Sequence, residues 1–148
     1  MCYHFSVAER IVIDTNVLVS TVLSSQSPNR ELLRRCFEGN YQPLISQKLF
    51  LEYEDVFSRT DLMQKSPFSP QQRERLLNNV LSICLLVPVY YLWRPNSPDE
   101  GDNHLLELAV AGNASSIVTY NVRDLKRAEL HFPVSVRTPA DLLKGDPS

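Results

Sequence analysis

The chain has 148 residues, of which 43% are hydrophobic and 22% charged, with a formal net charge of −2 and a pI near 5.9. These values are those of one globular domain, and they exclude a disordered or fibrous chain. The slight negative charge argues against a protein that coats nucleic acid by bulk electrostatics. This net charge is compatible with an enzyme that binds a short stretch of nucleic acid.

Targeting signals and cysteine motifs are both missing from the sequence. No apolar run is long enough to span a bilayer, and residues 1–5 lack the basic start and apolar centre of a signal peptide, so we expect a cytoplasmic protein without membrane contact. Three widely spaced cysteines indicate neither a disulfide framework nor a zinc site. We expect Cys36 and Cys84 to be small apolar core residues.

Strands and helices alternate along the chain. Apolar and β-branched runs predict strands at 11–13, 43–45, 84–87, 116–119 and 134–136. Periodicity and capping residues predict helices that begin near Val17, cover 31–37, follow the caps Ser46 and Ser69, open with a capping box at 97–100, and begin at Thr138. This alternation predicts an α/β fold, a mostly parallel sheet with helices on both faces.

The ligand site of such a sheet lies beyond the carboxyl ends of its strands. Asp14, Thr15 and Asn16 follow the strand at 11–13 directly, which makes Asp14 the first candidate. Because strand-to-helix turns also favour these residue types as caps, this segment alone leaves a structural and a functional interpretation open.

Three further carboxylates extend the candidate site. Asp102 falls by helical geometry in the middle of an apolar stripe, where a solvated cap would not point. Glu52 lies at the border of its helix's apolar arc, although it could instead pair with Lys48. Asp124 follows the fourth strand, in a turn that is also common without function. Right-handed winding brings all four acids toward one edge of the sheet.

Carboxylates without histidine or cysteine select Mg²⁺ or Mn²⁺ over zinc. Acids held together repel one another, and a divalent cation relieves that repulsion. The same cation activates water and neutralises phosphodiester oxygens, so the pattern favours phosphodiester hydrolysis.

Four segments also follow one another in an order and spacing typical of one known family. They are IVIDTNVLVS at 11–20, LEYEDVFSR at 51–59, DNHLLELA at 102–109 and IVTYNVRDL at 117–125. In these segments the chain resembles the PIN domain, in the branch that includes toxins of bacterial toxin–antitoxin pairs. The resemblance implies a three-layer α/β/α fold with a central sheet of four to five strands over residues 10–143, an N-terminal extension at 1–9 and a C-terminal tail at 144–148.

The resemblance assigns roles to single residues. It makes Asp14, Glu52 and Asp102 metal-binding acids, with Thr15, Asn16 and Thr119 as supporting polar groups. Many PIN domains carry Asp where this chain has Asn121, so either Asn121 or the nearby Asp124 completes the site.

The same resemblance implies an endoribonuclease that uses Mg²⁺ or Mn²⁺, a homodimer and a cognate antitoxin. Arg123, Lys126 and Arg127 are candidates for RNA phosphate contacts, although a solvated helix face explains them as well. His104 lies opposite the apolar stripe of its helix, so we expect a surface histidine outside the site.

Two alternatives compete with a ribonuclease. A phosphatase that forms an aspartyl intermediate also places Asp after its first strand, but it expects a second Asp where Asn16 stands. A catalytically weak or inactive PIN-like module that binds RNA or a partner is favoured by Asn121 and by the acidic pI.

Overall fold

The computed structural model describes residues 8–24, 28–89 and 100–145, and the side chains of 100–103 lie outside that description. Its centre is one sheet of five parallel strands in the order β3-β2-β1-β4-β5. The strands are β1 (Glu9–Ile13), β2 (Tyr41–Ile45), β3 (Leu85–Leu86), β4 (Ser116–Val118) and β5 (Ser135–Arg137). The predicted parallel α/β sheet is therefore confirmed.

The register of the two central strands decides which residues meet at the carboxyl edge. Ile13 of β1 pairs with Val118 of β4, and the backbone N–H of Asp14 donates to the Val118 carbonyl at 2.9 Å. The residues that follow the two strands, Asp14 and Thr119, are therefore neighbours.

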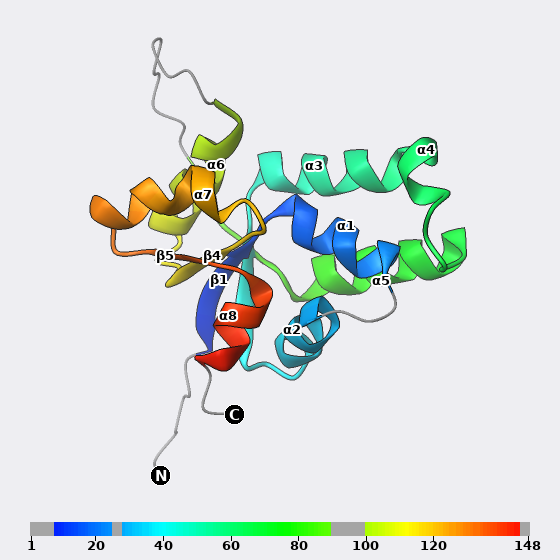
Figure 1. Cartoon of the computed structure of the whole chain (residues 1–148), viewed down its shortest axis with the longest axis horizontal. Helices are drawn as coiled ribbons and strands as arrows, with labels where there is room; N and C mark the ends of the chain where they lie inside the picture. Colours follow the sequence, from blue (N-terminus) through cyan, green and yellow to red (C-terminus); the bar gives the residue numbers. More distant parts are fainter. Residues whose placement is uncertain (1–7, 25–27, 90–99, 146–148) are drawn as a thin grey trace.

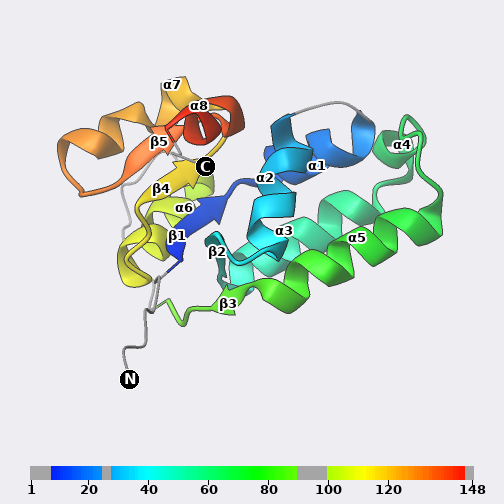
Figure 2. The same cartoon turned by 90° about the horizontal axis from the view of Figure 1, so that it is seen from below.

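Helices cover both faces of the sheet, so that the fold has three layers, α/β/α. They are α1 (Thr15–Leu23), α2 (Pro28–Phe37), α3 (Gln47–Ser58), α4 (Thr60–Met63), α5 (Pro70–Ile83), α6 (Glu100–Ala111), α7 (Val122–Leu125) and α8 (Pro139–Lys144), with a 3-10 helix η1 (Lys126–Leu130). α2 packs against α8 on one side of the sheet, and α6 packs on β1, β2 and β4 from the other (Figure 1). α3 contacts α1, α5 and α6, and it runs beside α5 in Figure 2. Within the described ranges no helix is long and apolar enough to cross a membrane.

Capping residues set several helix boundaries as expected. The Ser46 hydroxyl accepts from the Leu49 N–H at 3.1 Å, and Ser69 forms a reciprocal capping box with Gln72 ahead of α5. α2 gives way to Gly39, whose φ of 88° is in the left-handed region that glycine tolerates. The capping box expected at 97–100 starts outside the described residues.

Some boundaries differ from the prediction. β1 begins at Glu9, inside the segment assigned to the N-terminal extension, because Glu9 pairs with Tyr41 of β2. The third strand is limited to Leu85–Leu86, and both leucines are exposed because β3 is the edge strand. The short helices α4, α7 and η1 were not predicted, since four or five residues are too few to show a helical period.

The core lies on both faces of the central strands. Ile11, Val12 and Ile13 have 1% exposure or less, as expected for a strand covered from two sides. Cys36 is buried and Cys84 half-buried, and both thiols are free, in agreement with their interpretation as apolar core residues.

Candidate functional site

The Asp14 side chain is turned toward the neighbouring strand end. Asp14 occupies the N-cap position of α1, but its carboxylate makes no cap hydrogen bond within the described part of the chain. Instead, its Oδ2 accepts from the Thr119 hydroxyl at 2.8 Å and from the Asn16 amide at 3.3 Å. Capping alone therefore does not explain the side-chain position.

A small hydrogen-bond network connects the turn after β1 with the turn after β4. Asn16 Nδ2 lies 3.4 Å from Thr119 Oγ1, and Asn16 Oδ1 accepts from the Tyr120 backbone N–H at 3.3 Å. Thr119 Oγ1 also accepts from the Asn121 N–H at 2.9 Å. The two turns hold each other in place, and Thr119, with no exposed surface, is the centre of the network.

Glu52 reaches this edge from α3. Its Oε2 accepts from the Thr15 hydroxyl at 3.3 Å, and Thr15 follows Asp14 in the chain. Its Oε1 lies 2.9 Å from His104 Nε2. Among the described contacts Glu52 therefore bonds to Thr15 and His104, while Lys48, the alternative partner, is exposed on the same helix.

His104 is buried, and its expected surface position is wrong. Only 2% of the side chain is exposed, because α3 packs against α6 and covers the side that the apolar stripe of α6 leaves open. Burial lowers the pKa of His104 below its usual 6.5, since losing hydration disfavours the imidazolium more than the nearby Glu52 carboxylate favours it. The helical pattern of α6 contained no sign of this cover, which comes from a distant segment.

The remaining two predicted acids are less defined by the structure. Asp102 belongs to the first turn of α6, two residues before His104, but its side chain lies outside the described residues. Asp124 is exposed on α7. Their roles in the site stay predictions.

An open cavity of about 560 Å³ adjoins Asp14. Its lining includes some polar residues of the network and apolar residues of α1 and α3: Asp14, Thr15, Asn16, Val19, Ser20, Leu23, Ser24, Val56 and Asn121. Asn121, and not Asp124, is in this lining. Three basic residues that follow Asn121 in the chain are exposed: Arg123, Lys126 and Arg127. Lys126 pairs with Glu129 at 3.1 Å.

The donor chemistry of this edge fits a hard divalent cation. Asp14 and Asn121 line the cavity and offer carboxylate and amide oxygens, and Glu52, bonded to Thr15, adds a second carboxylate. Mg²⁺ and Mn²⁺ accept these ligand types. Among the described side chains, no three His, Cys, Asp or Glu residues come together as a complete site. Asp102, the third acid that the sequence predicts, has its side chain outside the described residues.

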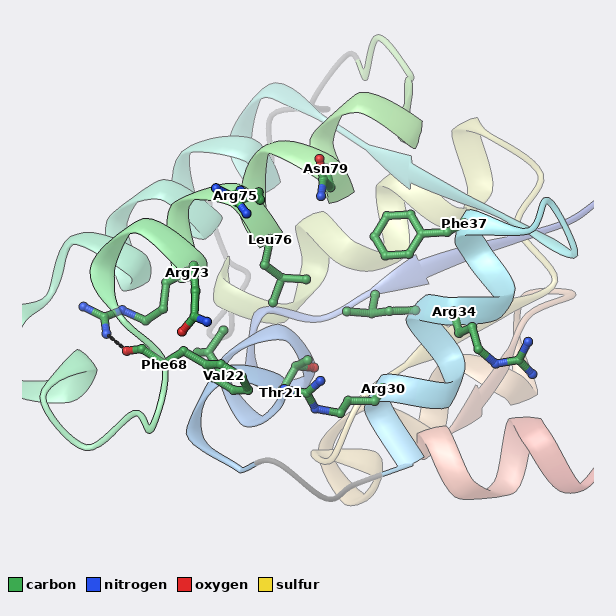
Figure 3. A pocket seen from close by; sticks show the side chains of 12 residues that line it. Thr21, Val22, Arg30, Arg34, Phe37, Phe68, Arg73, Arg75, Leu76 and Asn79 are labelled. Carbon is green, nitrogen blue, oxygen red and sulfur yellow. Dashed lines mark hydrogen bonds between the residues drawn. The ribbon is translucent and has the colours of Figure 1, made fainter.

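A second cavity, of about 540 Å³, lies between α1, α2 and α5 (Figure 3). Apolar side chains of these helices and Phe68 form much of its lining, and arginines surround them: Arg30, Arg34, Arg73 and Arg75. The Arg30 guanidinium lies 4.6 Å from the centroid of the Phe68 ring, and Arg73 donates to the Phe68 carbonyl at 2.6 Å. No pattern in the sequence indicated that these segments line one cavity, because they are distant along the chain.

Comparison with known proteins identifies the family. In the Rickettsia felis VapBC2 structure, solved bound to a DNA fragment from the promoter, a chain shares 19% identity and a TM-score of 0.53 with this protein. The match covers 86% of this chain and 98% of that one, and it supports the fold. No curated protein matches the chain significantly. A sequence model of the PIN domain matches residues 10–123, most of the chain, and the protein therefore belongs to the PIN domain family, whose members are generally nucleases.

Proposed function

We propose that this protein is a metal-dependent endoribonuclease that hydrolyses RNA phosphodiester bonds, as the toxin of a toxin–antitoxin pair. The observation that carries the proposal is the Asp14 carboxylate, which Thr119 and Asn16 hold beside an open cavity at the carboxyl edge of the sheet. Membership of the PIN family supports nuclease chemistry at this edge.

In this proposal Asp14, Glu52 and Asp102 hold Mg²⁺ or Mn²⁺, and Asn121 or Asp124 supports them. The cation, when bound, activates water and neutralises charge on the phosphodiester. The chain's own groups fix the acids before any ligand arrives: Thr119 orients Asp14, and Thr15 ties Glu52 to the same turn. Arg123, Lys126 and Arg127 contact the RNA phosphates.

The decisive experiment compares Asp14→Asn with the wild type on labelled RNA oligonucleotides. The wild type should cleave with Mg²⁺ or Mn²⁺ and stop with EDTA, and Asp14→Asn should not cleave. Asp61→Asn, the same change at an exposed position of α4, is the matched control. Circular dichroism confirms that the variants are folded. Metal-dependent cleavage by Asp14→Asn at the wild-type rate would refute the assignment of Asp14 to the metal site.

The cavity between α1, α2 and α5 supports the proposal that this chain binds a protein partner. An apolar lining with an arginine rim suits an amphipathic helix that carries acidic residues, and in this proposal the antitoxin supplies that helix. The similar chain belongs to the VapBC2 complex, which supports an antitoxin as the partner of this chain. Co-expression with the product of an adjacent small gene should yield a stable complex, and Arg75→Glu should weaken it. Light scattering of the isolated chain tests the proposed homodimer.

The second candidate, an RNA- or partner-binding module without catalysis, is favoured by Asn121, which lines the cavity as a neutral amide where many PIN domains carry an acid. This alternative predicts that the wild type binds RNA and leaves it intact with every divalent metal. It further predicts that Asn121→Asp, which restores a charge beside Asp14, gains cleavage.

A further inference from the structure

A histidine of α6 touches a carboxylate of α3 that also bonds to the turn after β1. His104 is 2% exposed, and its Nε2 lies 2.9 Å from Glu52 Oε1, whereas the Glu52 side chain keeps 38% of its surface exposed. The contact therefore joins a residue fixed in the interior to an acid at the edge of the site.

Both oxygens of Glu52 are held. His104 contacts Oε1 from α6, and the Thr15 hydroxyl donates to Oε2 from the first turn of α1 at 3.3 Å. A glutamate side chain has several rotatable bonds, and its free rotation would otherwise let the carboxylate leave the edge. Two donors from two different helices restrict it to one orientation.

Packing alone does not account for a histidine at this position. His104 Nδ1 is buried and has no hydrogen-bond partner among the described residues. Leaving such a buried atom without a hydrogen bond is destabilising, so an apolar side chain of similar size would pack there with less penalty. The feature that an apolar side chain would lack is the contact with Glu52.

We propose that His104 is a positioning residue for Glu52, an inference that rests on the proposed metal-dependent nuclease function. His104 reaches neither substrate nor cation in this role and acts by fixing the direction of the Glu52 carboxylate. Groups that hydrogen-bond to metal-binding carboxylates and imidazoles typically change metal affinity or activity 10- to 100-fold when they are removed. The same range is expected here.

Three variants test the proposal. His104→Leu removes the donor and keeps the bulk, His104→Gln restores an N–H donor at a similar distance, and His131→Leu makes the same change at an exposed site beyond η1. The readouts are the Mn²⁺ dissociation constant by calorimetry, kcat and KM on an RNA oligonucleotide, and thermal unfolding.

We expect His104→Leu to weaken Mn²⁺ binding and lower kcat by roughly 10- to 100-fold with KM little changed. His104→Gln should recover most of both, and His131→Leu should match the wild type. If His104→Leu does not fold, His104→Gln with its own Mn²⁺ affinity at least tenfold weaker would refute positioning through a donor. Folded His104→Leu with wild-type affinity and kcat would overturn the positioning role and leave the nuclease proposal standing. A wild type that neither binds Mn²⁺ nor cleaves RNA would overturn both.

Discussion

The hydroxyl of Thr119 donates a 2.8 Å hydrogen bond to Asp14 Oδ2 and joins the carboxyl ends of β4 and β1. The same oxygen accepts from the Asn121 N–H at 2.9 Å, so it acts as donor and acceptor at once. Thr119 is completely buried, and no solvent contact can replace either bond. A hydroxyl is thus the group that satisfies both neighbours.

Thr119→Val should therefore impair both stability and cleavage. The methyl group that replaces the hydroxyl leaves the Asn121 N–H without its partner, which costs about 1–3 kcal/mol in the free energy of unfolding. Release of Asp14 should lower cleavage by roughly 10- to 100-fold. Urea unfolding and RNA cleavage assays measure the two effects.

Thr119→Ser is the matched control, because it keeps the hydroxyl and removes only a methyl group. Its cleavage rate should stay within a few-fold of the wild type. If valine and serine at this position cleave equally well, the hydroxyl does not orient Asp14.

The sequence was sufficient to predict that the ends of the strands before Asp14 and Asn121 reach one edge of the sheet, but not the hydrogen bond between Asp14 and Thr119. Both strands are apolar runs typical of buried parallel strands, and right-handed crossovers carry the ends of such strands to one edge. Helix starts at Ser46 and Ser69 were equally predictable, since capping depends on residues close in sequence. These features depend on local patterns and on one general rule of chain topology.

His104 shows why the rest was not predictable. The apolar stripe of α6 indicates which side of the helix meets the sheet, but it carries no information about a second helix that arrives from another part of the chain. α3 covers His104 because it packs against α6 as well as α1. For the same reason the cavity lined by Arg30, Phe68 and Leu76 could not be inferred from any one segment.

Asn121 and Asp124 should respond differently to substitution. Asn121 lines the cavity with Asp14, so Asn121→Asp adds a negative charge to the cation site and should tighten Mn²⁺ binding. Asp124 is exposed on α7, and Asp124→Asn should leave Mn²⁺ affinity within about twofold of the wild type, because water screens exposed charges. Calorimetric titration of both variants measures the difference. Loss of Mn²⁺ binding in Asp124→Asn would instead assign the fourth ligand to Asp124.

Glu129 links η1 to the last strand and should make stability depend on acid pH. Its carboxylate accepts from the Val136 N–H at 2.7 Å, and this bond, with a smaller effect from Lys126, lowers the pKa of Glu129 below its usual 4.5. A carboxyl whose pKa is lower in the folded state stabilises the fold fully above the unfolded pKa. That stabilisation is lost as the pH falls through the folded pKa.

Glu129→Gln removes the ionised form, and the variant should be less stable than the wild type at pH 7. The difference in the free energy of unfolding should shrink steadily below pH 4.5. Urea unfolding at pH 7 and in steps below pH 4.5 measures this difference. Glu74→Gln, at an exposed position of α5, is the control. A difference that stays constant across this range would mean that the charge of Glu129 contributes nothing.

Cys36 and Cys84 should resist alkylation while the protein is folded. Burial raises the pKa of each thiol to about 12, so at pH 7.5 the reactive thiolate is rarer than in the unfolded chain by a factor on the order of 1,000. Iodoacetamide should therefore modify these two cysteines slowly in buffer and rapidly in urea. Peptide mapping by mass spectrometry follows each site separately from Cys2, which lies outside the described residues. Rapid labelling of Cys36 in buffer would show that α2 separates from β2, where the structure packs them together.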